Sequence, residues 1–387
     1  MKVAEYDVLL VSRVLPAEAR YGLGKGVTLL GQALQESGLR VLCLSPADLP
    51  PAWIDQAERW AARINRWAGR CFIAYRDLGL IRQICHCVAL GRYACEEARR
   101  RGIGVIHVHD VGIAWGVLQA RKRGDKLRCG LTQHSFDSTT HAIHHHVQPL
   151  PSWLRRLGAA LERRVLTRLD WVVFLSQASR RDTAAQLGCR VGERWQVLPH
   201  PLPPMAFPPR TTARAALGWN DEERVLVAVG QLIPMKGFDR LIAACADYPG
   251  SLRLLLLGEG NVYPLSVLAA GLGVRCDFTV SDDIASYLAA ADLYVSASLT
   301  ESYGFANVEA MLAGLPVVAT AVAAVPEVLS GSDAILVAPE PAALRRGIEQ
   351  ALAADPAGLT PVRERWLKAQ PTAAMVAAQH RQWYGLS

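Results

Sequence analysis

Two carboxylates, Glu301 and Glu309, flank Gly304 in the run Glu-Ser-Tyr-Gly-Phe-Ala-Asn-Val-Glu. Gly304 allows the backbone to approach a ligand closely, and residues 306–313 are typical of a helix whose first N–H groups point toward an anion. A carboxylate held beside such amides binds sugar hydroxyls while the amides hold a phosphate. The alternative is that both acids are solvated at a helix edge, but their spacing around Gly304 favours a ligand site.

The same segment continues into a predicted helix cap at Gly314 and a buried strand over residues 315–320. This loop, helix and strand resemble the signature of the retaining nucleotide-sugar glycosyltransferases of family 4, whose two-domain architecture is called GT-B. The resemblance implies that Glu301 touches the donor sugar and that Glu309 holds the nucleotide ribose. It also implies that the donor diphosphate is contacted by the backbone amides of Tyr303, Gly304, Phe305 and Ala306.

A second candidate loop, Gly230 to Asp239, follows a predicted strand over residues 225–229 and leads into a helix. A Lys-Gly turn is usually only a helix entry, but the family uses this loop to bring an arginine and a lysine to the donor diphosphate. Lys236 matches the lysine, whereas Gln231 stands where the arginine is common. The missing cation implies either weaker diphosphate binding or a compensating group elsewhere.

Two further loops resemble nucleotide contacts of the family. Gly258 follows a predicted strand over residues 253–257, as in the family's Gly-x-Gly turn near the nucleotide, although glycine after a strand is common. Ser281 follows a predicted strand over 276–280, where the family's loop lies against the base. Those base contacts are largely made by backbone, so this loop does not identify the base.

In the first half, the run Tyr21-Gly-Leu-Gly-Lys-Gly follows the first predicted strand and precedes a helix that ends at Gly38. Glycines at a helix start permit close approach of a phosphate. The run is not the G-x-G-x-x-G dinucleotide fingerprint. The family usually has two adjacent glycines here, and the resemblance implies that Gly22 contacts the phosphate, with Gly24 as the near alternative.

Histidines close two predicted strands of the first half: His107 and His109 at one, and His134 at the other. A histidine at a strand end is as often a structural donor as a catalytic group. The resemblance places His134 against the donor sugar, where it orients a hydroxyl and does not take the reacting proton. The residues assigned to catalysis are therefore Glu301, His134 and Lys236.

The histidine-rich segment of residues 141–146 does not favour a metal site, because adjacent histidines seldom point at one ion and no carboxylates accompany them. The resemblance implies that no metal or other cofactor is needed, since amides and cations hold the diphosphate of a UDP- or GDP-sugar substrate. Nine cysteines without CxxC pairs are expected to be free thiols in a reducing compartment.

The elements that must position these residues are short apolar strands alternating with helices, which predicts parallel sheets. A linker with six prolines spans residues 199–209. We therefore expect a GT-B α/β fold in which two doubly wound, Rossmann-like domains face each other across a cleft. The expected parts are an acceptor-binding domain (1–199), a donor-binding domain (200–370) and a C-terminal helix (371–387) that crosses back to the first domain.

Charge is divided unevenly: residues 1–199 carry 29 Lys and Arg against 17 Asp and Glu, a balance of +12, while residues 200–387 have a balance of −5. The basic half suggests an anionic partner, either an acceptor or a membrane surface, and no nucleic-acid-binding motif is present.

Trp53, Trp60 and Trp67 recur among arginines at a spacing that forms a helical stripe, and residues 153–168 form a second basic amphipathic stretch. These features predict peripheral membrane contact and a lipid-linked acceptor. The alternative is that the tryptophans pack onto their own domain.

The start of the sequence is unlike a secretory signal, and no apolar run is long enough to span a membrane, so we expect a cytoplasmic protein that contacts the inner face of the cell membrane. The expected function is a retaining hexosyltransferase that acts in the synthesis of cell-surface polysaccharide or glycolipid. Its sugar, nucleotide base, acceptor and linkage stay open. The alternatives are a sugar phosphorylase or nucleotide-sugar epimerase of GT-B fold, and a non-catalytic scaffold at a membrane surface.

Overall fold

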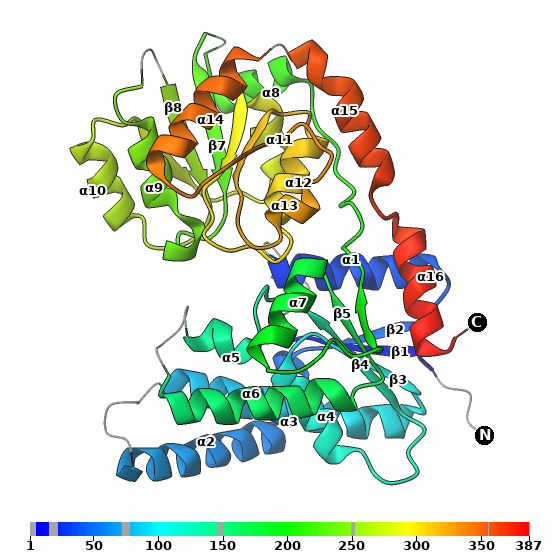
Figure 1. Cartoon of the computed structure of the whole chain (residues 1–387). Helices are drawn as coiled ribbons and strands as arrows, with labels where there is room; N and C mark the ends of the chain where they lie inside the picture. The colour runs from blue at the N-terminus through cyan, green and yellow to red at the C-terminus, as the bar shows by residue number, and fades with distance from the viewer. Residues whose placement is uncertain are drawn as a thin grey trace. The chain divides into compact units, whose positions relative to one another are not determined.

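The structure is a computed structural model that describes residues 5–14, 22–71, 78–144, 150–220, 222–248, 252–354 and 356–386. Its contacts divide the chain into two compact units (Figure 1). Unit 1 comprises Met1–Pro201 together with Pro371–Ser387, and unit 2 comprises Leu202–Gln370. The proline-rich segment of residues 199–209 forms neither helix nor strand, because its prolines lack the N–H that regular structure needs.

Unit 1 is built on a six-stranded parallel sheet in the order β2-β1-β3-β4-β5-β6. The strands are short and apolar, as expected for strands covered on both faces. Their bounds are β1 Val8–Val11, β2 Val41–Leu44, β3 Val105–Val108, β4 Arg128–Gln133, β5 Trp171–Phe174 and β6 Trp195–Val197.

Helices cover both faces of this sheet (Figure 1). On one face α1 packs beside α16, the helix from the C-terminal segment, so that the two ends of the chain share one layer. The helices of unit 1 are α1 Gly22–Glu36, α2 Pro51–Cys71, α3 Leu78–Arg101, α4 Val111–Ala120, α5 Thr139–Ala142, α6 Ser152–Arg168, α7 Gln177–Gln186 and α16 Ala373–Tyr384.

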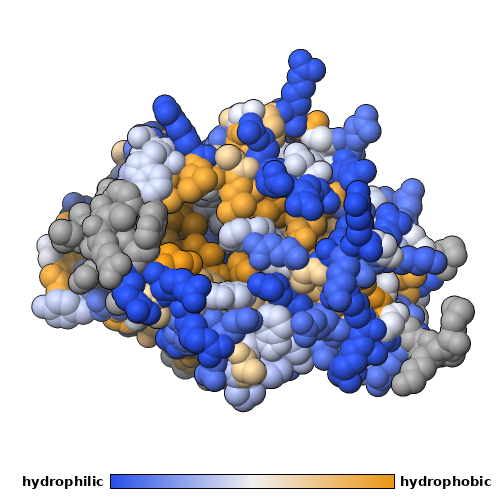
Figure 2. Space-filling view, turned by 90° about the horizontal axis from the view of Figure 1, so that it is seen from below, coloured by the Kyte–Doolittle hydropathy of each residue, from blue (hydrophilic) through white to orange (hydrophobic). Residues whose placement is uncertain are grey.

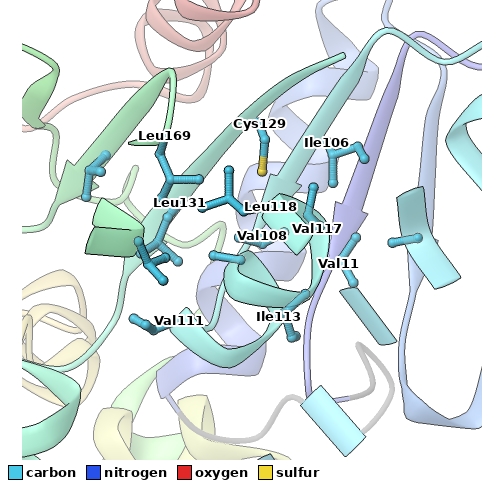
Figure 3. Close-up of a cluster of buried hydrophobic side chains, with 14 of the residues drawn as sticks. Val11, Ile106, Val108, Val111, Ile113, Val117, Leu118, Cys129, Leu131 and Leu169 are labelled. Atoms are coloured by element: carbon cyan, nitrogen blue, oxygen red, sulfur yellow. The ribbon is translucent and has the colours of Figure 1, made fainter. Parts of the chain in front are cut away.

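Alternate residues of the strands point to opposite faces, which divides the core of unit 1 into two clusters. Leu9 and Val11 of β1 face α3 and α4, whereas Val8 and Leu10 face α1 and α16. Figure 3 shows the first cluster, in which aliphatic side chains of α4 lie against those of β1, β3 and β4. This rigid sheet fixes the strand ends from which the polar loops project.

Unit 2 repeats the architecture with a parallel sheet in the order β12-β11-β10-β7-β8-β9. Its strands are β7 Arg224–Val229, β8 Leu252–Leu257, β9 Cys276–Thr279, β10 Leu293–Ser296, β11 Val317–Thr320 and β12 Ile335–Val337. Its helices are α8 Arg210–Leu217, α9 Phe238–Cys245, α10 Tyr263–Gly271, α11 Ile284–Ala290, α12 Phe305–Leu312, α13 Val325–Val328, α14 Pro341–Ala353 and α15 Pro356–Ala369.

The apolar runs in the sequence predict every strand but one, over residues 7–11, 40–44, 105–108, 128–132, 171–175, 225–229, 253–257, 276–280, 293–296, 315–320 and 334–337. These bounds differ from those of the strands by no more than two residues. The exception is β6, which has three residues and was not predicted. The predicted doubly wound parallel sheets are confirmed. Within the described ranges, no helix has the length and apolar character needed to cross a membrane.

Candidate nucleotide-sugar site

The topology of unit 2 brings two polar loops together at one edge of its sheet. From β7 the chain proceeds outward through β8 and β9, and it then returns to the other side of β7 as β10. β7 and β10 are therefore parallel neighbours at the point where the strand order reverses. In open parallel sheets this switch point, at the carboxyl ends of the strands, is the usual place for a ligand.

Lys236 and Glu301 meet at this switch point, as the loops after β7 and β10 predict. Nζ of Lys236 donates to Oε1 of Glu301 over 2.5 Å, and Oγ of Ser298 donates to the same oxygen over 2.8 Å. The side chains of Lys236 and Glu301 are 23% and 16% exposed, so both are largely buried but still accessible to a ligand. The pair places one cation and one carboxylate where an incoming ligand can contact both.

Backbone contacts hold the two loops against each other. The N–H of Leu299 donates to the carbonyl of Met235 over 2.8 Å. Gly237 adopts φ of +61°, and a Cβ atom there would overlap with the carbonyl oxygen of Ala297. Only glycine fits this turn without strain, because it tolerates positive φ and leaves room for the neighbouring backbone.

The start of α12 lies directly after Glu301. Gly304 is its N-cap, with φ of +78°, and as a glycine it provides no side-chain cap. The first helical residues, Phe305 and Ala306, form the N-terminus of α12, and a helix N-terminus is a type of site that attracts anions. The aromatic rings of Tyr303 and Phe305 meet edge to face at 4.9 Å, and burial raises the pKa of Tyr303.

Glu309 and Asn307 of α12 are both 1% exposed, far more buried than Glu301. The two carboxylates, Glu301 and Glu309, contribute after burial to the raised pKa of Tyr294. Neither Nδ2 nor Oδ1 of Asn307 has a hydrogen-bond partner within the described part of the chain. No feature of the sequence indicates that Asn307 is buried, because asparagine is usually exposed.

The remaining predicted residues of unit 2 lie on three successive strand ends. The N–H of Gly230 donates to the carbonyl of Leu257 over 2.9 Å, and a Cβ on Gly258 would overlap with the Gly230 carbonyl, so these two loops are in contact. Gln231 is exposed. Ser281, after the edge strand β9, accepts a hydrogen bond from the N–H of Asp283 over 3.0 Å.

In unit 1 the glycine run differs from the expectation. Gly22 is already the first residue of α1, so Gly22 and Gly24 are helical, whereas the sequence predicted a loop before the helix. Gly22 is exposed and Gly24 is buried. Tyr21 lies outside the described residues. This geometry makes Gly22, at the helix start, the better placed of the two predicted glycines for a phosphate.

A row of histidines follows the strand ends of unit 1. His109, after β3, and His134, after β4, approach each other with Nδ1 to Nε2 at 2.9 Å. His200, which lies in the proline-rich segment after β6, stacks on His134 with ring centroids 5.4 Å apart. A Cβ on Gly26 would lie 2.6 Å from the His200 ring and 3.1 Å from the His134 ring. Gly26 thus allows both rings to pack against α1, a role that the sequence did not indicate.

Burial keeps these imidazoles neutral. It lowers the pKa of His109 and of His200 to about 3, and that of His134 well below its ordinary value. Neighbouring histidines contribute to each shift, and Arg13 adds to that of His134. A neutral imidazole can donate or accept a hydrogen bond, which is the chemistry that the role expected for His134 requires.

The predicted tryptophan stripe packs inward where the structure describes it. The ring of Trp53 lies 6.2 Å from that of Tyr93 on α3, and the guanidinium of Arg92 lies over Trp60 at 5.2 Å. The side chain of Trp67 lies outside the described residues. In the histidine-rich segment 141–146, residues 145 and 146 also lie outside them. Within the described part of the chain, no three His, Cys, Asp or Glu side chains are arranged to hold a metal ion.

Comparisons with solved structures agree with this architecture. Sucrose-phosphate synthase from Thermosynechococcus elongatus superposes with a TM-score of 0.75 over 98% of both chains, at 21% identity. Anabaena HepE, in a structure with UDP and glucose, gives a TM-score of 0.68 at 18% identity, over 98% of this chain and 99% of that one. The fold is therefore GT-B.

Two family models match adjacent parts of the sequence: Glycosyltransferase Family 4 over residues 21–204, and Glycosyl transferases group 1 over residues 209–371. Lipopolysaccharide glucosyltransferase WaaG from Escherichia coli (strain K12) is 32% identical over 38% of this chain. The match spans 43% of WaaG, less than half of that relative's length. The chain belongs to the family 4, or group 1, glycosyltransferases.

Proposed function

We propose that the protein transfers a sugar from a nucleotide diphosphate sugar to an acceptor hydroxyl with retention of the anomeric configuration. The Lys236–Glu301 pair beside the start of α12 carries this proposal. Charge develops on the diphosphate as the glycosidic bond breaks, and Lys236 with the amides of Tyr303, Gly304, Phe305 and Ala306 stabilises it. Glu301 holds the donor sugar.

The other residues complete the donor site in this proposal. Glu309 holds the ribose, the loops at Gly230, Gln231, Gly258 and Ser281 contact the nucleotide, and Gly22 or Gly24 contacts the phosphate. His134 orients a sugar hydroxyl. A donor phosphate oxygen receives the acceptor proton, so the reaction needs neither a protein base nor a bound metal.

Product analysis tests this proposal. The protein is incubated with UDP- and GDP-sugars, singly and with candidate acceptors, and nucleotide release and product anomers are followed by NMR spectroscopy. The UDP-sugars are the first choice, because HepE structures contain UDP and UDP-glucose. A product with the donor's anomeric configuration supports retention, whereas an inverted product contradicts it.

The same assay separates the alternatives. A dependence on inorganic phosphate indicates a phosphorylase, and isomerisation without an acceptor indicates an epimerase. Calorimetry with UDP and GDP tests for a scaffold, which should bind neither nucleotide. Lys236→Met should weaken UDP binding about tenfold to a hundredfold and lower turnover, whereas the matched control Lys368→Met, which changes an exposed lysine on α15, should do neither.

We also propose that the acceptor is a glycan or a lipid-linked glycan, and that unit 1 contacts an anionic membrane surface at the inner face of the cell membrane. Figure 2 views the molecule from below and shows a hollow lined by hydrophobic residues, with hydrophilic residues farther out on the same face. On α6, Trp153 and Leu157 are 42% and 58% exposed beside the exposed Arg155 and Arg156. Exposed apolar and basic groups on one helix are typical of interfacial binding. Because Trp53 and Trp60 pack inward, α6 replaces α2 as the contact.

Vesicle flotation tests the membrane contact. The protein should float with phosphatidylglycerol vesicles and not with phosphatidylcholine vesicles, and Trp153→Ser with Leu157→Ser should weaken flotation. Val267→Ser, which changes a hydrophobic residue of unit 2 that is 54% exposed, is the matched control. Equal flotation with both lipids, or no effect of the α6 double variant, would contradict the contact.

A further inference from the structure

The contact between His109 and His134 indicates which nitrogen of each ring carries the proton. Nδ1 of His109 and Nε2 of His134 are 2.9 Å apart, a hydrogen-bond distance. Each neutral imidazole carries one N–H, and the bond needs one donor and one acceptor. Either His134 donates from Nε2, or His109 donates from Nδ1.

The surroundings of His109 distinguish the two arrangements. Its side chain is buried, and its Nε2 atom has no hydrogen-bond partner within the residues that the structure describes. If His134 donates, the proton of His109 must lie on this Nε2, which leaves a buried N–H without an acceptor. Such orphaned buried donors are rare in folded proteins because they lose their hydrogen bonds to water without replacement. If His109 donates, Nε2 carries only a lone pair, which avoids the orphaned donor.

Contacts with β1 and with the ring of His107 fix the position of the His109 ring. Its backbone N–H donates to the carbonyl of Val11 over 3.0 Å, and its ring stacks on that of His107 at 4.7 Å. His107 is itself held at both nitrogens, by the hydroxyls of Tyr384 at 2.7 Å and Thr132 at 2.8 Å. The donor nitrogen of His109 is thus aimed at His134 by a rigid stack.

Both rings must be neutral for this proton count to hold. The groups that face His134 electrostatically are His109, His200 and Arg13, and those that face His109 are His200 and His380. Each of these disfavours a further positive charge, and burial acts in the same direction. Near pH 7 both imidazoles therefore keep a single proton.

We propose that His109 is a positioning residue that holds His134 as the Nδ1–H tautomer, so that His134 presents a hydrogen-bond donor to a sugar oxygen. The contact between His134 and a sugar oxygen rests on the proposed function. The tautomer itself does not, because it follows from contacts within unit 1. His109 does not need to touch the ligand, because it acts by donating a hydrogen bond from its Nδ1–H to Nε2 of His134.

Imidazole ¹⁵N NMR spectroscopy of the full chain tests the tautomer without any substrate. In the wild-type protein, Nδ1 of His134 should carry the proton, which is the tautomer that free histidine disfavours. His109→Asn places an amide N–H near the lost Nδ1–H and should preserve this state. His109→Leu removes the donor and should shift the proton of His134 to Nε2. His86→Leu, on α3, is the matched control and should leave the His134 spectrum unchanged.

The wild-type spectrum decides the matter even if a variant does not fold. A proton on Nε2 of wild-type His134, or an unchanged Nδ1–H tautomer in folded His109→Leu, would overturn the assignment. Turnover of a nucleotide sugar should fall about threefold to tenfold in His109→Leu, in line with one neutral hydrogen bond, and recover in His109→Asn. If the tautomer is as expected and no nucleotide sugar reacts, the proposed function is wrong and the role of His109 stands.

Discussion

Lys236 and Glu301 form an ion pair of 2.5 Å between loops that follow two neighbouring strands, β7 and β10, of one sheet. Before a ligand arrives, each charge has the other as its partner. A bound diphosphate would compete with the carboxylate for the ammonium group, and the sugar hydroxyls would then become partners of Glu301. The pair therefore predicts that the two residues affect binding and turnover differently.

The first prediction concerns this difference. Lys236→Met should weaken UDP binding about tenfold to a hundredfold, because a hydrogen bond between charged groups contributes roughly 1.5–3 kcal/mol. Glu301→Gln should leave UDP affinity unchanged or slightly higher, since it removes a competitor for Lys236, while lowering turnover of the whole nucleotide sugar. Calorimetry measures the affinity for UDP, and steady-state kinetics measure the turnover of the nucleotide sugar. Equal losses of UDP affinity in both variants would contradict separate roles.

The second prediction concerns the turn that positions Lys236. Gly218 and Gly237 have nearly the same φ, +66° and +61°, but a Cβ meets nothing within 4 Å at Gly218 and overlaps with the Ala297 carbonyl at Gly237. Gly218→Ala should cost about 1–2 kcal/mol from left-handed backbone strain alone. Gly237→Ala should cost at least about 1–3 kcal/mol more through overpacking. Urea unfolding followed by circular dichroism compares the two, and equal midpoints would refute the argument.

The sequence predicts every strand of the two sheets except β6, and it predicts the loops after β7 and β10, because apolar runs and strand-end glycines are local signals. It also predicted that Lys236 and Glu301 converge, since parallel strands end at one edge. It could not predict that Asn307 is buried without hydrogen-bond partners in the described chain, or that the His200 ring packs against Gly26. Both features depend on tertiary packing. The seven-residue spacing of Trp53 and Trp60 correctly predicted a helical stripe, but periodicity does not say whether α3 or a membrane covers it.

The third prediction concerns acid stability. Burial lowers the pKa of His109 and His200 to about 3 and that of His380 to about 4, and the pKa values of His107 and His134 fall well below the ordinary value. Unfolded histidines bind protons below pH of about 6.5, whereas these folded ones do not. The free energy of unfolding should therefore fall as the pH drops from about 6.5 toward 4.

His380 isolates one contribution to this slope. Its Nδ1 contacts the carbonyl of Val376 at 2.8 Å, within α16. His380→Leu removes one proton-binding site from the unfolded chain, so near pH 5 the slope of unfolding free energy against pH should decrease by about 1.4 kcal/mol per pH unit. Gln379→Leu, the neighbouring position on the same helix, should leave the slope unchanged. Denaturant titrations from pH 7 to pH 4.5 measure both, and identical slopes in the two variants would count against buried neutral histidines.

The last prediction concerns the buried amide of Asn307 in α12. Its Nδ2 lies 2.7 Å from the position of a Cβ on Gly304, and neither amide atom has a hydrogen-bond partner within the described chain. An unsatisfied buried group costs about 1–3 kcal/mol, so the similarly shaped Asn307→Leu should raise the free energy of unfolding by about that amount. Asn261→Leu is the matched control, because exposed Asn261 accepts a hydrogen bond from the N–H of Tyr263 over 3.1 Å and should gain nothing. Thermal melting with and without UDP measures both effects. A destabilised Asn307→Leu variant would show that the amide is satisfied in solution, and a smaller shift of its melting temperature by UDP would show that the ligand supplies the missing partner.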